Sequence, residues 1–170
     1  MGGGGGGWSP SHGGAADIEK LQDVARTELE KPSPAPRRKV FLSFRGEDKT
    51  LVDLFRGQAK NENSDLDFID FSLRAPFNSE NAEYIRRGIR QRIEQSSVTI
   101  VCLTESTHTS EWVDWEIRES VRLGKGVICV RMKDDPSIKI PKAAEECGAK
   151  VVSWNHKEIR QAIDEAAENR

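Results

Sequence analysis

Long hydrophobic segments are absent from this sequence. No apolar run approaches the ~20 residues that a membrane-spanning helix requires, and the amino terminus lacks the basic and apolar regions of a signal peptide. Cysteine is rare too, since the chain has only 3, without CxxC spacing. Cys102 and Cys129 lie in apolar segments, where a small buried thiol is usual. We therefore expect a cytoplasmic protein without a disulfide framework and without membrane association.

An excess of charge of one sign is also lacking. The 26 basic and 28 acidic residues leave a formal net charge of -2, which gives no bulk attraction to nucleic acid. The three histidines, His12, His108 and His156, form no ligand-like cluster, so we expect no metal site. What remains is a composition of 36% hydrophobic and 32% charged residues, long enough for one domain with an appendage.

The amino-terminal part differs in composition from the rest. Residues 1–15 are rich in glycine and bury too little surface to offset their ordering entropy, which predicts a disordered tail. Residues 16–37 hold a short amphipathic helix at 16–30 and a stiff proline-rich linker, "PSPAPRR". We place the main domain at residues 38–170.

Strand and helix patterns alternate five times in that domain. The expected strands are 39–44, 66–70, 97–104, 126–132 and 150–154. The expected helices begin near 48, 80, 111, 141 and 155. Such alternation predicts an α/β fold with a five-stranded parallel sheet, doubly wound, in the flavodoxin-like order 2-1-3-4-5.

Helical spacing predicts which faces are buried. The helix near 48 should turn one apolar set inward, namely Leu51, Leu54, Phe55 and Ala59. The helix at 80–95 should bury Ile85, Ile89 and Ile93. The helix at 111–123 should be capped by Ser110, end at Gly124 and bury Val113, Ile117 and Val121.

Ligands of such sheets bind at the carboxyl ends of the strands. This rule selects the segments "SFRGEDK", "DFSLRAPFNSE" and "TESTHTSEW". In the helix after the last of them, Trp112, Glu116 and Ser120 form the stripe beside the core. Glu116 is therefore either a functional carboxylate at the edge of the core or an ordinary glutamate in the first half of a helix, where acidic residues are favoured.

Four segments in this order resemble TIR domains. "KVFLSFRGED" resembles their first strand and loop, "DFID" their second strand, and "SSVTIVCLTEST" their third. "SEWVDWEI" resembles the helix that bears a Trp-x-x-x-Glu motif, here Trp112 and Glu116. The resemblance covers roughly residues 38–155 and is closest to bacterial TIR-like proteins of Thoeris antiphage systems.

The resemblance implies NAD+ chemistry, with Glu116 as the catalytic residue. Enzymatic TIR domains cleave the nicotinamide–ribose bond and release or cyclise ADP-ribose, so NAD+ is substrate and no cofactor is expected. Cleavage builds positive charge on the ribose, which a fixed carboxylate stabilises. Because nicotinamide leaves as a neutral molecule, one carboxylate can suffice. Trp112 would stack on a flat ring or exclude water.

Other residues near the predicted site allow two interpretations each. Phe44, Arg45 and Gly46 follow the first strand, where Gly46 allows a tight turn and Arg45 either meets a pyrophosphate or is solvated. Asp70 either binds ribose hydroxyls or caps its loop, and we favour the cap.

The loop after the second strand often mediates assembly and gates the pocket in TIR domains. Arg74 and Phe77 lie in this loop, and Phe77 serves such a role or folds back onto the core. The loop lacks the glycine-rich character that is common there. His108 is close to the predicted site, but we expect it to be a solvated loop residue. Trp115 is expected to point away from Trp112 and to cover a neighbouring surface or an interface.

Three other functions compete with the NAD+ enzyme. A phosphoacceptor receiver needs an aspartate after the third strand, where Thr104 and Glu105 stand. A deoxyribosyltransferase-like enzyme would lack the "FLSFRGED" match. The main alternative is a non-enzymatic TIR adaptor that binds other TIR domains. For the enzyme we expect self-assembly or another trigger and a separate effector protein that responds to the product.

Overall fold

The computed structural model describes residues 15–30, 37–61, 66–71 and 75–170, with the side chains of 18–27 in the first range. The chain divides after Ala35 into two units. The first contains helix α1 (Ala15–Glu30), where the amphipathic spacing predicts a helix. The predicted tail up to residue 14 and the linker at 31–36 lie outside the described residues.

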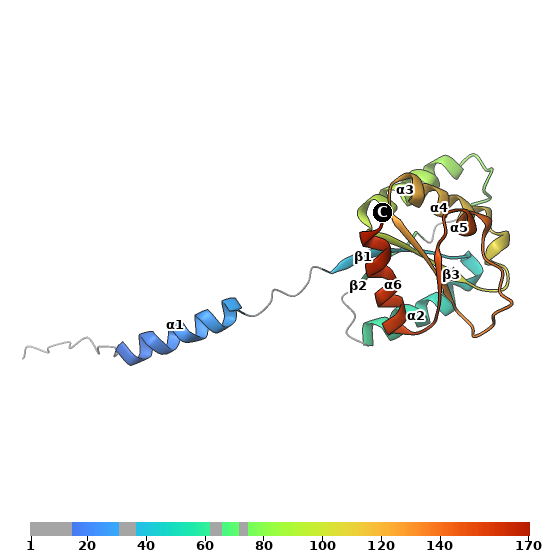
Figure 1. Ribbon diagram of the computed structural model, residues 1–170. Coiled ribbons are helices and arrows are strands. Elements are labelled where there is room, and N and C mark those ends of the chain that lie inside the picture. Colours follow the sequence, from blue (N-terminus) through green and yellow to red (C-terminus); the bar gives the residue numbers. More distant parts are fainter. Residues whose placement is uncertain (1–14, 31–36, 62–65, 72–74) are drawn as a thin grey trace, which may run out of the picture. The chain divides into compact units, whose positions relative to one another are not determined.

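The second unit is built on a parallel sheet of five strands. These are β1 (Arg38–Ser43), β2 (Leu66–Ile69), β3 (Val98–Leu103), β4 (Gly126–Arg131) and β5 (Lys150–Ser153). Their order is β2-β1-β3-β4-β5, and every neighbouring pair is parallel, which confirms the predicted topology. The strand order reverses between β1 and β3, at the centre of the sheet (Figure 1).

Five helices and two 3₁₀ turns connect the strands. The helices are α2 (Lys49–Asn61), α3 (Ala82–Gln95), α4 (Glu111–Arg122), α5 (Lys142–Glu146) and α6 (His156–Glu168). The 3₁₀ turns are η1 (Gly46–Asp48) and η2 (Thr107–Thr109), directly before α2 and α4. Because both turns follow the carboxyl ends of strands, they belong to the edge where ligands of such sheets bind.

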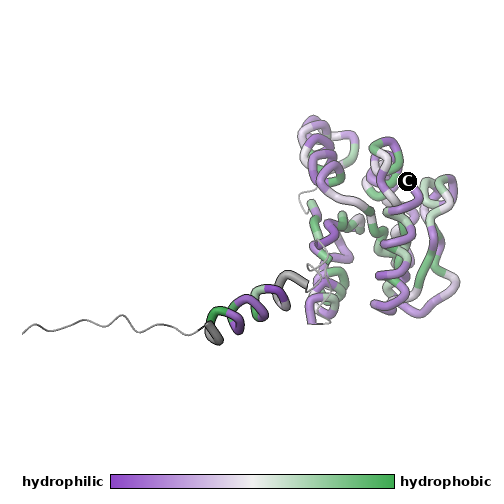
Figure 2. The backbone as a smooth tube through the Cα atoms, turned by 60° about the vertical axis from the view of Figure 1, so that its left-hand side comes forward, coloured by the Kyte–Doolittle hydropathy of each residue, from purple (hydrophilic) through white to green (hydrophobic). Residues whose placement is uncertain are grey.

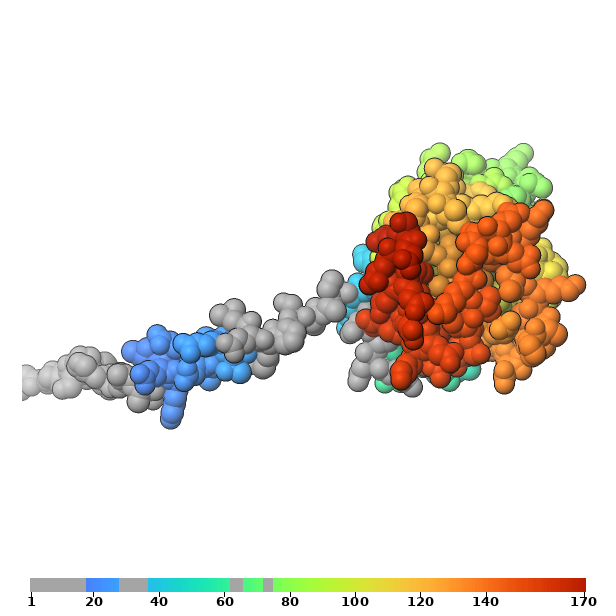
Figure 3. Space-filling model, viewed as in Figure 1, coloured from blue at the N-terminus to red at the C-terminus, as the bar shows by residue number. Residues whose placement is uncertain are grey.

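The helices form a layer on each face of the sheet (Figure 1). On one face, Val52 and Phe55 of α2 and Ile159 and Ile163 of α6 pack on alternate strand residues. On the other, α3, α4 and α5 cover the remaining strand residues. Figure 2 shows the hydrophobic segments concentrated in the interior of this unit, and Figure 3 shows α6 in red beside the β4–β5 region in orange. The inner strands β3 and β4 and most of β1 are therefore buried on both faces, as parallel sheets require, whereas the edge strands β2 and β5 keep exposed residues.

Local signals fix both ends of α4. The Ser110 side chain accepts a hydrogen bond from the Val113 amide at 3.2 Å, and Gly124 takes a φ of 68° just after the helix. A side chain at this φ would be strained, which is why glycine ends the helix. Asn155 likewise accepts from the Glu158 amide at 3.1 Å and caps α6. The predicted cap and stop of α4 are both confirmed.

Two predicted core residues are exposed. Leu54 of α2 is 55% exposed and Val52 is buried instead, whereas the predicted Phe55 and Ala59 are buried and Leu51 packs against the core. Val121 is 47% exposed because α4 turns Glu116, Ile117 and Ser120 to the sheet, and its last turn reaches the amino edge. The predicted Ile85, Ile89 and Ile93 face of α3 is buried. Among the described helices, none has the length and apolar character to cross a membrane.

Candidate active site

A cleft lies at the carboxyl edge of β1, beside the start of α4. Its volume is about 700 Å³. We call it the Trp112 cleft, and its lining residues are Phe44, Arg45, Gly46, Glu47, Ala75, Thr109, Ser110 and Trp112. Four predicted site residues, Phe44, Arg45, Gly46 and Trp112, therefore meet in one place, although they come from chain segments more than sixty residues apart.

Glu116 lies one helical turn after Trp112 and is completely buried. Its Oε2 accepts a hydrogen bond of 2.5 Å from the hydroxyl of Ser43, the last residue of β1. Phe44, the next residue after Ser43, lines the Trp112 cleft. The carboxylate therefore adjoins the cleft through both chain segments, but it is not part of the exposed lining.

The orientation of Ser43 follows from strand alternation. Val40, Leu42 and Phe44 point to the face covered by α2 and α6. Residues of the opposite parity, Phe41 and Ser43, therefore point to the α3–α4 face, where Phe41 packs with Trp112. Ser43 is the hydroxyl that a buried carboxylate on α4 requires, since an unpaired buried charge is costly.

Further hydroxyl groups extend this polar seam. Ser120 donates a 2.7 Å hydrogen bond to the backbone oxygen of Glu116, and its hydroxyl lies 2.7 Å from that of Thr99 on β3. Ser43, Thr99, Glu116 and Ser120 are all buried. The interface of α4 with β1 and β3 thus contains a continuous polar row within an otherwise apolar layer.

Trp112 forms one wall of the cleft and fastens the loop after β2. Its side chain is nearly buried, and its Nε1 donates a 2.8 Å hydrogen bond to the Ala75 oxygen. The Phe77 ring meets the indole edge-on, with centroids 5.0 Å apart. Arg86 donates to the Phe77 oxygen at 2.9 Å and lies over its ring at 4.4 Å. Phe77 thus supports Trp112 from behind and does not line the Trp112 cleft.

The predicted separation of Trp112 and Trp115 was wrong. The two indoles meet edge-on with centroids 6.2 Å apart. A step of three residues turns the helix by about 300°, which is only about 60° in the other direction, so neighbouring large rings still touch. Trp115 lines the adjoining Trp115 cleft, about 390 Å³ in volume, together with Phe77, His108, Thr109, Ser110, Glu111, Asp114, Arg118 and Lys142.

Charges are balanced at the mouth of the Trp112 cleft. Arg45 lies 3.3 Å from the Glu47 carboxylate, and both residues line the cleft. Backbone hydrogen bonding, and then the Arg45 guanidinium, lowers the pKa of Glu47. Gly46 does not take a positive φ, so the turn at this position does not itself require glycine. A methyl group on Gly46 would meet no atom within 4 Å.

The remaining predicted residues do not join the Trp112 cleft. Asp70 pairs with Arg56 of α2, with 2.7 Å between Oδ2 and Nη1, and is absent from the lining. A ribose-binding role for Asp70 therefore has no support from its position. His108 lies between the Trp115 cleft and a third cleft described below. Arg74 lies outside the described residues.

Ser43 is the site residue that sequence reasoning missed. It stands in "KVFLSF" as the one hydroxyl residue of a buried strand, at its carboxyl end. A polar side chain at such a position needs a partner, and this signal was available from the sequence. The identity of the partner was not, because it comes from a helix 73 positions away.

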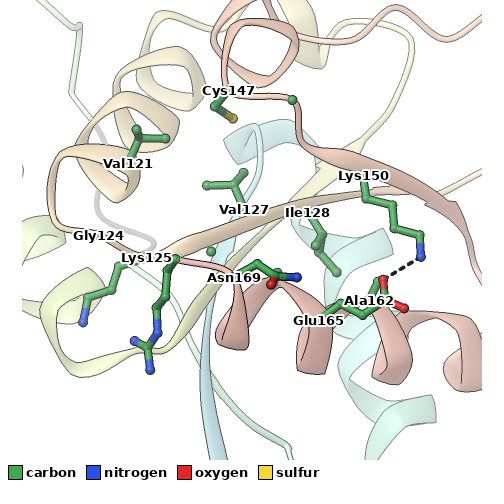
Figure 4. Close-up of a pocket in the computed structure, with 14 residues that line it drawn as sticks. Val121, Gly124, Lys125, Val127, Ile128, Cys147, Lys150, Ala162, Glu165 and Asn169 are labelled. Atoms are coloured by element: carbon green, nitrogen blue, oxygen red, sulfur yellow. Dashed lines mark hydrogen bonds and ion pairs between the residues drawn. The ribbon is translucent and has the colours of Figure 1, made fainter.

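Another pocket lies at the opposite edge of the sheet (Figure 4). It measures about 420 Å³ between the amino end of β4 and the end of α6, and includes Val121, Lys125, Lys150 and Glu165. Lys150 and Glu165 pair there at 2.9 Å. No predicted site residue lines it, and the amino edge of a parallel sheet is not where such folds bind ligands. We therefore assign the candidate active site to the Trp112 cleft.

The described residues contain neither a reactive thiol in the candidate site nor a cluster of metal ligands. Cys102, Cys129 and Cys147 are free thiols. Burial raises the pKa of Cys129 to about 12 and that of Cys102 further, so both stay protonated. Within the described part of the chain, no group of three His, Cys, Asp or Glu residues is arranged to hold a metal ion.

Comparison with known proteins gives a family match over the same region. The family described as "Thoeris protein ThsB, TIR-like domain" matches residues 41–137. The chain is also 25% identical over 117 residues to a protein of Cytobacillus dafuensis named "Putative cyclic ADP-D-ribose synthase TIR2". That alignment covers 68% of this chain but only 31% of the relative, so the chain spans less than a third of the relative's length.

Two solved structures are similar to this chain at low sequence identity. The TIR domain of the Toll-related receptor TRR-2 from Hydra magnipapillata is 16% identical, with a TM-score of 0.47 and coverage of 74% of this chain and 91% of that one. The CMP N-glycosidase BcmB from Clostridium botulinum is 14% identical, with a TM-score of 0.45 and coverage of 75% and 98%.

Proposed function

Because the chain belongs to the family of the TIR-like domain of the Thoeris protein ThsB, we propose that it is an NAD+-processing enzyme with Glu116 as its catalytic carboxylate. NAD+ is the substrate in this proposal, and no additional cofactor takes part. The observation that carries it is the position of Glu116, held by Ser43 one turn behind the Trp112 wall of the cleft.

The chemistry needs few groups. Cleavage of the bond between nicotinamide and ribose generates an oxocarbenium-like ribose, and a carboxylate fixed by a hydrogen bond stabilises that charge without reorganising. Nicotinamide departs as a neutral molecule, so no strong general acid is needed. The residues around the cleft supply an aromatic wall in Trp112 and Phe44 and one guanidinium in Arg45.

Burial of Glu116 adds a condition for turnover. The carboxylate is fully covered, and the cleft is lined by Trp112, one turn before Glu116, and by Phe44, the residue after Ser43. Substrate therefore reaches it only after the Trp112 wall shifts. The indole is fastened by one hydrogen bond, to Ala75, and by ring contacts, so its displacement needs no change in the sheet. This requirement fits an enzyme that is inactive until assembly or another trigger moves the wall.

The product we propose is an ADP-ribose-type signal. The relative's name refers to cyclic ADP-D-ribose synthesis, and a site that excludes water favours attack by an internal group. A separate effector protein would respond to the signal, in a bacterial antiphage role. The protein would also self-assemble through TIR-type surfaces.

The test is NAD+ turnover by the full chain, with nicotinamide and ADP-ribose species separated by chromatography and identified by mass. Glu116→Gln is expected to lower turnover by about 100-fold or more, the usual cost of losing a group that stabilises the transition state. The product mass distinguishes hydrolysis from cyclisation. Turnover that survives Glu116→Gln would overturn the mechanism.

Glu119→Gln is the matched control on the same helix. Glu119 is also buried, but its carboxylate is held by Arg122 and Arg90, which lower its pKa to about 2. This variant should lose stability and keep turnover per folded molecule, whereas Glu116→Gln should stay folded and lose turnover. Denaturation curves of both proteins separate the two effects.

The burial of Glu116 favours one second candidate, a non-enzymatic TIR adaptor. In that case the seam of Ser43 and Glu116 serves packing alone. Wild-type and Glu116→Gln proteins would then show equal, near-zero turnover at high concentration with a crowding agent, while light scattering would detect assembly in both.

A further inference from the structure

A third cleft lies further along the carboxyl edge of the sheet, beyond β3. We call it the Arg131 cleft; it measures about 480 Å³, and its polar lining is His108, Arg131, Ser137, Lys139, Lys142 and Glu145. Arg131 is the last residue of β4, paired in register with Leu103 of β3 and Ser153 of β5. The cleft therefore occupies the edge where parallel sheets bind ligands, although no predicted catalytic residue lines it.

Arg131 has a buried nitrogen without a partner. Among the described residues its Nε is buried and makes no hydrogen bond, and its guanidinium forms no ion pair. The nearby Asp135 carboxylate is already engaged, since it accepts hydrogen bonds from the Ser137 hydroxyl at 2.6 Å and amide at 2.9 Å. Because buried guanidinium donors are normally satisfied, the Nε of Arg131 lacks a partner of the kind that an anionic ligand would supply.

His108 provides a second unpartnered nitrogen in the same lining. Its Nδ1 is buried and has no hydrogen-bond partner in the described part of the chain. The residue comes from η2, after β3, whereas Arg131 comes from β4. Two separate elements thus present buried, unused nitrogens to one cleft.

The charge of the cleft is mainly positive. Arg131, Lys139 and Lys142 face one carboxylate, Glu145. Lys139 has no hydrogen bond or ion pair within the described residues, whereas Lys142 lies 3.9 Å from Glu146 with its side chain 80% exposed. Hydrogen bonds from Ser137, and then nearby cations that include the Arg131 guanidinium, lower the pKa of Asp135. In the pocket of Figure 4, by contrast, Lys150 pairs with Glu165 at 2.9 Å. Basic residues therefore outnumber acidic ones in the lining of the Arg131 cleft.

We propose that the Arg131 cleft binds the diphosphate group of a nucleotide. A guanidinium donates paired hydrogen bonds to phosphate oxygens, an imidazole N–H donates one more, and the two lysines add charge at the rim. None of these groups is needed to bind the nicotinamide–ribose end, which the Trp112 cleft would hold. The site is thus distinct from the proposed catalytic centre.

Adjoining clefts suggest how the two sites are related. His108 and Lys142 line both the Arg131 and Trp115 clefts, and Thr109 and Ser110 line both the Trp115 and Trp112 clefts. The diphosphate can therefore belong to an NAD+ molecule whose nicotinamide–ribose end lies at Trp112. This assignment rests on the proposed function. The diphosphate can also belong to a separate phosphorylated nucleotide that binds this cleft alone.

The first experiment tests the anion site without any turnover. The full chain is titrated with inorganic pyrophosphate, with calorimetry for affinity and NMR of the His108 ring for location. Wild-type protein should bind and shift the His108 signals. Arg131→Gln should weaken binding at least 10-fold, since it removes a charged donor, and Lys139→Gln, an exposed change that leaves the core intact, should weaken it too.

Lys133→Gln is the matched control, because it removes the same charge two residues from Arg131 on a side chain that pairs with Glu105 at 2.8 Å and does not line the cleft. Its affinity should equal that of the wild type. Equal binding by all four proteins, or no shift of His108 at saturation, overturns the proposed site.

The second experiment distinguishes the two sources of diphosphate. If the group belongs to NAD+, Arg131→Gln raises the KM for NAD+ and leaves kcat unchanged. If it belongs to a separate nucleotide, KM is unchanged and binding of ADP-ribose, measured in the absence of NAD+, is lost in the variant. A wild-type protein that assembles at high concentration with a crowding agent and still shows no turnover overturns the proposed function, while the pyrophosphate titration still decides the anion site.

Discussion

Two glutamates on one helix illustrate how partners decide the role of a buried carboxylate. Glu119 is neutralised by Arg90 and Arg122 and ties α4 to α3. Glu116 accepts a hydrogen bond from Ser43, a neutral hydroxyl. A carboxylate in a water-excluded layer interacts strongly with a developing cation, which is what the proposed reaction supplies.

The contact between Ser43 and Glu116 can be measured through stability. Ser43→Ala should destabilise the protein by about 1.5–3 kcal/mol, the usual cost of removing a hydrogen bond to a charged group. In a Glu116→Gln background the cost should fall below about 1 kcal/mol, because a neutral amide depends less on the donor. Urea unfolding of the four proteins in this double-mutant cycle gives the coupling. Equal costs in both backgrounds would show that the hydroxyl does not support the carboxylate.

At the scale of elements, α6 approaches β4 closely because of one residue. A methyl group on Gly126 would lie 2.4 Å from the backbone oxygen of Ala166, a distance that no real contact allows. The obstacle is helix backbone, so it cannot turn aside as a side chain would. Gly126 is therefore required by packing, and its φ is not positive.

Gly126→Ala should cost about 1–3 kcal/mol of stability, as expected for overpacking in a close interface. Thermal unfolding of this variant is compared with Gly57→Ala in α2. No atom lies within 4 Å of a methyl group at position 57, and helix propensity predicts a gain of about 0.5–1 kcal/mol there. A Gly126→Ala protein as stable as the wild type would mean that α6 can shift away from β4 without loss.

The arrangement of strands also explains why the loops that line the Trp112 cleft lie together. Parallel strands bring their carboxyl ends to one edge, and the order reversal between β1 and β3 leaves room there for the Trp112 cleft. The 3₁₀ turns η1 and η2 then place Gly46 and Thr109 at its rim.

For the whole molecule, the described hydrophobic clusters all lie within residues 36–170. In α1, by contrast, Ile18, Leu21 and Val24 are more than half exposed. Removal of residues 1–35 should therefore leave the melting temperature within about 2–4 °C of the full chain, a shift below about 1 kcal/mol. Calorimetry of both proteins checks this. A larger loss would show that α1 contributes to the core of the second unit.

The sequence by itself determined the α/β class, the strand order and the positions of the helices. Apolar strands that alternate with amphipathic helices pack as a parallel sheet covered by helices. Local signals such as Ser110 and Gly124 set the ends of a helix independently of its tertiary contacts. It also brought Trp112 and Glu116 to adjacent turns of one helix, since their spacing is local.

Only the tertiary structure decided which side chains meet. Ser43 finds Glu116 because β1 and α4 pack together, Asp70 is taken by Arg56, and Leu54 is exposed while Val52 is buried. His108 and Arg131 reach one cleft because β3 and β4 are neighbours in the sheet. Contacts between distant segments depend on how helices lie on the sheet, and a difference of part of a turn changes each of them.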